Sequence, residues 1–208
     1  SPEIELLTTF ARLAAETIER AQLRERLAGE ARTDALTGLY NRREFDARLT
    51  EEYRRARRYV KPFALMMIDL DRFKQVNDDY GHAAGDAALK TLAGILKKQF
   101  RDVETIARYG GEEFVAILPE ISGGAAKQVA ERVCHAVAAT PFRLLDGVEV
   151  GVTVSIGVSC YPNCAGSPQE AMDRADQALY IAKEAGRNRV VLYREMLKAR
   201  IEQDPGCI

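Results

Sequence analysis

The sequence lacks any apolar run near the ~20 residues that a membrane-spanning helix needs, and no secretory signal is visible. It also lacks an excess of charge, because 30 Lys and Arg face 31 Asp and Glu. No basic field therefore indicates binding to nucleic acid. The four cysteines contain no Cys-x-x-Cys pair, and Cys160 and Cys164 cannot complete a tetrahedral zinc site, because the chain has only two histidines and both lie elsewhere. We expect reduced thiols in a cytoplasmic protein, with no membrane span in this segment.

Length and composition predict one globular domain with an appendage. The chain has 208 residues, 47% of them hydrophobic and 29% charged, which is enough to bury one core. We expect three segments. Residues 1–31 form an N-terminal signalling or coiled-coil helix, residues 32–195 form the domain, and residues 196–208 form a C-terminal tail that frays around Pro205-Gly206.

The N-terminal segment is predicted to be a long amphipathic helix. Turn-forming residues are almost absent, and apolar or small side chains recur every three or four positions. These positions are Ile4, Leu7, Ala11, Ala14, Ile18 and Ala21. Two interpretations remain open: a helix packed on its own domain, or a parallel coiled coil that joins two chains.

The rest of the chain alternates predicted helices and strands. Helices are expected at 42–60, 86–100, 123–140 and 168–185, the last one ended by Gly186. Strands are expected at 63–71, at 105–109 and 112–118 on either side of the Gly110-Gly111 loop, at 142–145 and 148–159, and at 189–193. The polar residues 72–80 are predicted to be a loop or a short turn. Interleaved helices and strands predict an α/β fold with one sheet and helices against it.

The first helix of the domain has two notable features. Asp34 and Thr37, in the turn before it, are available as capping residues. Four arginines lie along the helix, at Arg54, Arg55, Arg57 and Arg58. A run of this kind is more typical of a solvated helix face than of a nucleic-acid stripe.

The segment 105–118 is predicted to be a β-hairpin. Its apolar runs flank Gly110 and Gly111, and we expect both glycines to turn the chain with positive φ. Glu112 and Glu113 follow directly. Adjacent strand residues point to opposite faces, so we expect these carboxylates to have different roles. Alone, the pair would more simply be two solvated glutamates at a hairpin tip.

A second acidic stretch changes that interpretation. The apolar run that begins at Phe63 ends in Asp69 and Asp71, which is typical of a buried strand that delivers carboxylates to a sheet edge. If this strand pairs with the hairpin, Asp69 and Glu112 can form a hard oxygen site. Such a site suits a magnesium ion that bridges the phosphates of a substrate.

Five motifs together resemble the GGDEF family of diguanylate cyclases, in its Gly-Gly-Glu-Glu-Phe variant. They are Asp34-Ala-Leu-Thr-Gly-Leu-Tyr-Asn-Arg42, Ile68-Asp-Leu-Asp-Arg-Phe-Lys-Gln-Val-Asn77, Gly81-His-Ala-Ala-Gly-Asp86, Arg108-Tyr-Gly-Gly-Glu-Glu-Phe114 and Ala182-Lys-Glu-Ala-Gly-Arg-Asn188. The resemblance extends from Asp34 to Tyr193, in order and at family spacing, so the motifs support one another. The segment from Ile4 to Leu23 also resembles the last helix of a GAF sensory domain.

The resemblance implies a fold, a reaction and partners. It implies a central, mostly antiparallel sheet flanked by helices, similar to nucleotidyl cyclases and polymerase palm domains. The implied reaction condenses two GTP into cyclic di-GMP and two pyrophosphates at the interface of a homodimer. It also implies two Mg²⁺ or Mn²⁺ ions per active site.

The family pattern implies roles for individual residues. Asp69 and Glu112, with the carbonyl of Leu70, are expected to bind metal, and Glu113 is a candidate to activate the attacking hydroxyl. Three cations are expected at the β- and γ-phosphates: Lys74, Lys183 and Arg187. An in-line displacement of this kind depends on neutralised charge and on an aligned attacking oxygen.

The resemblance also implies recognition of guanine. Asn77 offers a donor and an acceptor and Asp86 accepts, which matches a guanine edge. Leu36 and Leu89 are expected as apolar walls, and Phe73 as a further substrate contact. Without the other motifs, Asn77 would simply be a turn residue and Asp86 a helix cap.

One stretch departs from the family pattern. Relatives with product feedback have Arg-x-x-Asp upstream of the glycines, whereas this chain has Arg101-Asp-Val-Glu104. The longer glutamate shifts the charge outward, and bidentate binding tolerates that poorly, so we expect weak or absent feedback. Arg132 lies where some relatives place a second product contact, although a surface arginine is the simpler interpretation.

Two other functions remain open from the sequence. One is a catalytically silent module that binds GTP or cyclic di-GMP and signals by contact. The intact acidic and basic residues named above speak against it. The other is a cyclase of different or mixed nucleotides, which Asp86 argues against, because a serine at this position marks relatives that accept adenine.

Overall fold

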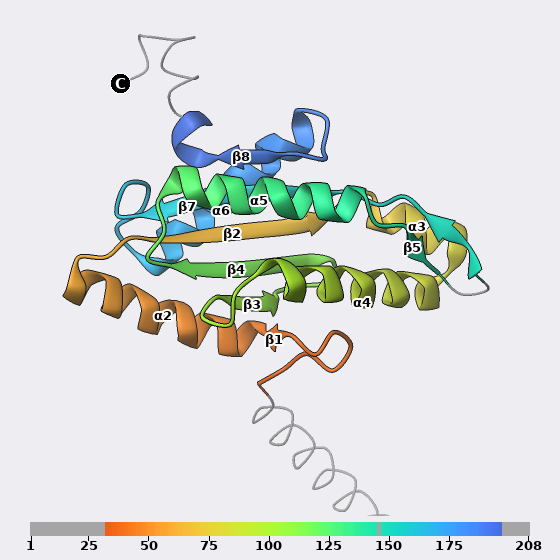
Figure 1. Ribbon diagram of the computed structural model, residues 1–208, viewed down its shortest axis with the longest axis horizontal. Helices are drawn as coiled ribbons and strands as arrows, with labels where there is room; N and C mark the ends of the chain where they lie inside the picture. The colour runs from red at the N-terminus through yellow and green to blue at the C-terminus, as the bar shows by residue number, and fades with distance from the viewer. Residues whose placement is uncertain (1–31, 145–146, 197–208) are drawn as a thin grey trace, which may run out of the picture. The chain divides into compact units, whose positions relative to one another are not determined.

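The computed structural model describes residues 32–144 and 147–196 (Figure 1). The described residues from Thr33 onwards belong to a single structural unit. The predictions for the helix at 1–31 and for the tail after residue 196 fall outside the described residues. None of the helices in the described part is long and apolar enough to cross a bilayer.

A central sheet of six strands organises the domain (Figure 1). In spatial order it contains β1 (Tyr40–Asn41), β3 (Thr105–Arg108), β4 (Glu113–Pro119), β2 (Phe63–Leu70), β7 (Val154–Tyr161) and β8 (Val190–Leu192). The three inner pairings are antiparallel and the two outer ones, β1 with β3 and β7 with β8, are parallel. The expected mostly antiparallel sheet flanked by helices is confirmed.

Helices cover both faces of this sheet. On one face, α2 (Arg42–Tyr59) and α6 (Pro168–Glu184) pack on Phe63, Leu65 and Met67 of β2. The opposite face packs against α4 (His82–Gln99) and α5 (Gly123–Ala138). Every position of β2 is buried, as expected for a central strand covered on both sides. The end of this strand is therefore a rigid support for the residues that follow it.

The prediction of a loop at 72–80 is wrong, because this segment forms helix α3 (Phe73–Tyr80). Phe73 and Val76 are half-buried and pack on the main core. The apolar stripe is short and lies among polar residues, so the helical period was not visible in the sequence. Gly81, with φ of 82°, separates α3 from α4, which begins at His82 rather than at Asp86.

Two smaller predictions also need correction. Asp34 and Thr37 do not cap α2; they form their own turn, and the side chain of Asn41 accepts from the Glu44 amide at 3.0 Å. The strand expected at 148–159 is divided into β6 (Glu149–Val150) and β7. The short β6 pairs with β5 (Phe142–Arg143) in a separate two-stranded sheet.

The hairpin of β3 and β4 is confirmed, but its turn differs from the prediction. Residues 109–112 connect the strands, and neither Gly110 nor Gly111 has a positive φ. The structure gives another reason for the first glycine. A Cβ atom on Gly110 would lie 2.7 Å from Oε2 of Glu113. Gly110 thus leaves room for the carboxylate of Glu113 to fold back over the turn.

The cysteines of the described part are free thiols, as expected. Cys134, Cys160 and Cys164 are all buried. Burial raises the pKa of the Cys134 thiol and that of the Cys160 thiol to about 12. These two thiols are therefore protonated at neutral pH and chemically inert.

Candidate active site

Asp69 lies at the end of the central strand and is 4% exposed. Its cross-strand partners are Glu113 on β4 and Ser155 on β7. Alternation along β2 places Asp69 on the same face as Phe63, Leu65 and Met67, the face covered by α6. The central strand thus delivers a buried carboxylate to one end of the sheet.

Both hairpin glutamates lie close to this aspartate. Glu113 is opposite Asp69 in the ladder, and the carbonyl of Glu112 accepts a hydrogen bond from the Leu70 amide at 3.3 Å. The prediction that the two glutamates point to opposite faces assumed that both are strand residues. Glu112 precedes β4, so strand alternation does not apply to it, and the charges of both glutamates act on Asp69.

We define the acidic cluster as Asp69, Glu112 and Glu113. Its environment changes the pKa of Asp69. Burial raises the pKa of Asp69 to about 6, and repulsion from Glu112 and Glu113 adds to this increase. The Lys183 ammonium, whose Nζ lies 2.8 Å from Oδ2 of Asp69, acts in the opposite direction. The cluster therefore favours a cation, and Lys183 provides one from the last turn of α6.

The donor set of the acidic cluster fits a magnesium ion. Carboxylate oxygens are available from Asp69 and Glu112, with the backbone of Leu70 between the two strands. Within residues 32–144 and 147–196, no three His, Cys, Asp or Glu side chains are arranged as a ready-made metal cage. In proteins, Mg²⁺ generally binds one or two carboxylates and completes its shell with water and substrate phosphates.

The three predicted phosphate-binding cations lie on α3, on α6 and in the loop after α6. Lys74 is exposed in the first turn of α3. Lys183 is in the last turn of α6, and Arg187 follows that helix with φ of 63°. The backbone of Arg187 is therefore not helical. Its spacing of four residues from Lys183 does not determine which way its side chain points.

The predicted guanine-binding residues are brought together by α3 and α4. Asn77 is in the last turn of α3, and Asp86 is exposed in the first turns of α4. Leu36, Phe73 and Leu89 belong to the same apolar cluster. Leu89 is 1% exposed, so it lies beneath the surface rather than forming an open wall.

Sequence reasoning missed the role of Gly85 in this arrangement. A Cβ atom on Gly85 would lie 2.0 Å from Oδ1 of Asn77 and 3.1 Å from Cζ of Phe73. The glycine therefore lets the Asn77 amide lie against the backbone of α4, next to Asp86. The only sign of this role in the sequence is that Gly85 directly precedes Asp86.

A second missed feature is an arginine that holds the hairpin tip. Arg108 donates to the carbonyl of Gly111 at 2.8 and 3.1 Å and to the Asp34 carboxylate at 3.3 Å. Asp34 also accepts from the amide and hydroxyl of Thr37. The turn at 34–37 and the loop before Glu112 are thus joined through one guanidinium.

The Arg-x-x-Glu stretch is occupied by its own ion pair. The Glu104 carboxylate, 7% exposed, accepts from the Arg101 backbone amide at 2.7 Å and from the guanidinium at 2.8 and 3.0 Å. Arg132 donates to the side chain and to the carbonyl of Gln99, the last residue of α4. Both arginines therefore have protein partners at this end of α4.

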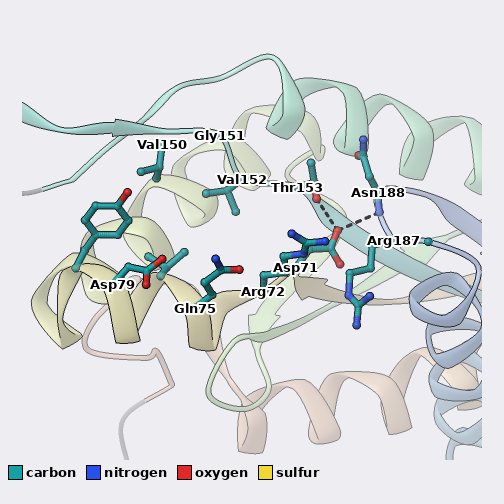
Figure 2. A pocket seen from close by; sticks show the side chains of 13 residues that line it. Asp71, Arg72, Gln75, Asp79, Val150, Gly151, Val152, Thr153, Arg187 and Asn188 are labelled. Carbon is teal, nitrogen blue, oxygen red and sulfur yellow. Dashed lines mark hydrogen bonds between the residues drawn. The ribbon is translucent and has the colours of Figure 1, made fainter.

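A pocket of about 400 Å³ lies between α3, the segment before β7 and the loop after α6 (Figure 2). Asp71 lines this pocket on the side of the loop after α6, next to Thr153, Arg187 and Asn188. From the sequence, Asp71 was identified only as the second acid at the end of the strand that begins at Phe63.

The fold and the acidic cluster define the class as a nucleotidyl-cyclase-like α/β domain. A sequence model for the family described as "Diguanylate cyclase, GGDEF domain" matches residues 31–189. The chain therefore belongs to the GGDEF domain family of diguanylate cyclases, which confirms the resemblance seen in the sequence.

Individual relatives agree with this assignment. Diguanylate cyclase DgcP of Pseudomonas aeruginosa is 46% identical over 162 residues, which are 77% of this chain and 24% of that protein. The solved GGDEF domain of PA1120 (TpbB or YfiN) from Pseudomonas aeruginosa has a TM-score of 0.76 at 39% identity, covering 83% of this chain and 99% of that one. The GGDEF domain of DgcB from Caulobacter crescentus, solved in complex with c-di-GMP, has a TM-score of 0.75 at 33% identity, covering 79% and 97%.

The curated relatives are longer than this chain. It spans 24%, 45% and 52% of the length of three of them.

Proposed function

We propose that this chain is a diguanylate cyclase that condenses two GTP into cyclic di-GMP and two pyrophosphates. The observation that carries the proposal is the acidic cluster, in which a buried strand-end aspartate meets two hairpin glutamates beside Lys183. Membership of the family and the names of the relatives support the same reaction.

In this proposal the acidic cluster is divided by role. Asp69 and Glu112, with the carbonyl of Leu70, hold Mg²⁺ or Mn²⁺, two ions per active site. The bound ions supply positive charge that stabilises the transferring phosphoryl group. Glu113 accepts the proton of the attacking 3′-hydroxyl or orients that hydroxyl.

The cations bind the leaving group. Lys74 and Arg187 contact the β- and γ-phosphates, and Lys183 joins them after it separates from Asp69. A metal ion held by Asp69 and Glu112 would supply the positive charge that Lys183 gives to Asp69 in this structure, which would leave Lys183 available to a phosphate. Lys183 would then have two successive partners in the same site.

Each domain holds one GTP, so two chains complete the site as a homodimer in the cytoplasm. Residues 1–31 would then act as the signalling helix that sets how two domains of 32–195 meet. We expect product feedback through Arg101 to be weak or absent. The guanidinium that would bind the product already has a carboxylate partner in Glu104.

The activity is tested by incubating the chain with GTP and Mg²⁺ and measuring cyclic di-GMP by chromatography and pyrophosphate by a coupled assay. We expect both products in a 1:2 ratio, and no mixed product when ATP is added. GTP binding without pyrophosphate release would contradict the proposal and favour a silent binding module.

Guanine recognition is proposed for Asn77 and Asp86, with Leu36, Phe73 and Leu89 beneath the base. We expect Gly85→Ala to weaken GTP binding by about 10-fold or more, because the new methyl displaces the Asn77 amide and leaves a polar group of the base without its partner. Binding is measured by calorimetry. Gly124→Ala, in the first turn of α5 with nothing near its Cβ, is the matched control and should bind GTP as the unmodified chain does. Equal affinity of both variants would contradict this role of Asn77.

A further inference from the structure

Asp71, two residues beyond Asp69, is a buried carboxylate with no role in the reaction described so far. It is 6% exposed and accepts three hydrogen bonds. The Ser155 hydroxyl donates to Oδ1 at 2.7 Å. The Thr153 hydroxyl at 2.7 Å and the backbone amide of Asn188 at 3.0 Å donate to Oδ2 (Figure 2). The carboxylate thus joins the end of β2 to β7 and to the loop after α6.

That loop has an unusual backbone. Gly186, Arg187 and Asn188 all have positive φ, at 112°, 63° and 47°. For the two non-glycine residues this conformation is sterically unfavourable and persists only where surrounding contacts hold it. The amides of Gly186 and Arg187 donate back to α6, at Lys183 and Ala182. The amide of Asn188 instead donates to Asp71, which supplies a side-chain contact from a different element.

We propose that Asp71 is a positioning residue that fixes the left-handed loop so that Arg187 points at the β- and γ-phosphates. The inference rests on the proposed function, which assigns Arg187 to those phosphates. Ser155 strengthens the link, because it donates to Asp71 and is also the cross-strand partner of Asp69. Asp71 therefore fixes the position of the phosphate-binding loop relative to the metal-binding end of β2.

Asp71 acts as an acceptor rather than as a metal ligand. Its three donors are neutral groups, and both carboxylate oxygens are engaged by them. An asparagine can reproduce this pattern: its oxygen accepts from Thr153 and Asn188, and its amide donates to the hydroxyl of Ser155. Alanine cannot. The pair Asp71→Asn and Asp71→Ala thus separates hydrogen bonding from charge.

The test compares two probes, GMP and a GTP analogue with a methylene bridge between the α- and β-phosphorus atoms, by calorimetry with Mg²⁺. Asp71→Ala should weaken binding of the analogue by about 10-fold and leave the affinity for GMP within about twofold, because GMP lacks the phosphates that Arg187 contacts. Asp71→Asn should bind the analogue within about threefold of the unmodified chain.

A double-mutant cycle shows whether the effect passes through Arg187. In an Arg187→Ala background, Asp71→Ala should change the affinity for the analogue by less than about twofold, because the residue it positions is gone. Additive losses, an equal loss for GMP, or a tenfold loss in Asp71→Asn would each overturn the proposal. If Asp71→Ala does not fold, Asp71→Ser replaces it in the cycle.

The outcome is separable from the proposed function. An unmodified chain that binds the analogue no better than GMP, or that makes no cyclic di-GMP, contradicts the function itself. An active unmodified chain with an additive cycle contradicts only the role of Asp71.

Discussion

Glu112→Gln is expected to lower the rate of cyclic di-GMP formation by about 10²- to 10³-fold or more, the cost of removing a charge that stabilises a transition state. The substitution keeps the shape of the side chain and the backbone carbonyl that accepts from Leu70. It removes only the negative charge that a metal ion needs beside Asp69. The rate is measured by chromatography of the product at saturating GTP and Mg²⁺.

The control for this variant is Glu51→Gln, an isosteric change at an exposed position of α2. It should have unchanged turnover. Thermal unfolding should give similar midpoints for both variants, because Glu112 is partly exposed and its backbone contact is preserved. Turnover of Glu112→Gln within tenfold of the unmodified chain would contradict the metal-binding role of Glu112.

Gly157→Ala is expected to lower the free energy of unfolding by about 3 kcal/mol or more, which is the upper end of the range typical of overpacked cores. A Cβ atom on Gly157 of β7 would lie 2.0 Å from the carbonyl oxygen of Ala175 and 2.2 Å from the amide nitrogen of Leu179. Both atoms are backbone of α6, so no rotamer change relieves the contact. The whole helix must move away from the sheet, and Lys183 moves with it.

The measurement is urea unfolding followed by circular dichroism. Gly94→Ala, at an exposed position inside α4 with nothing near its Cβ, is the matched control. It should raise the free energy of unfolding by roughly 0.5–1 kcal/mol, because alanine restricts the unfolded chain and favours the helix. If both variants unfold at the same urea concentration, the close packing of α6 on β7 is contradicted.

Much of the fold was predictable because its central elements have strong local signals. β2 is an uninterrupted apolar run, and α2, α5 and α6 have apolar residues at helical spacing. The sequence also showed that one strand ends in aspartate and that the hairpin contains two glutamates. The predicted oxygen site of Asp69 and Glu112 depended on the condition that these strands pair, and the structure shows that β2 and β4 do pair.

The remaining features depend on contacts between elements far apart in the sequence. The left-handed loop at 186–188 is held by Asp71, 117 positions earlier than Asn188. Gly85 is needed because the Asn77 side chain lies against it, and Gly110 because Glu113 folds over it. No local pattern distinguishes such glycines from ordinary turn residues. Helix α3 was missed because its stability comes from packing on the core and not from its own polar sequence.

A crystal structure of the chain with Mg²⁺ and the methylene-bridged GTP analogue tests the central claim most directly. We predict oxygens of Asp69 and Glu112 at about 2.0–2.1 Å from an ion that also contacts the phosphates. Asn77 and Asp86 should meet the guanine edge, and Lys183 should have left Asp69 for a phosphate. An ion bound by phosphates and water alone, with Lys183 still paired to Asp69, would contradict the account.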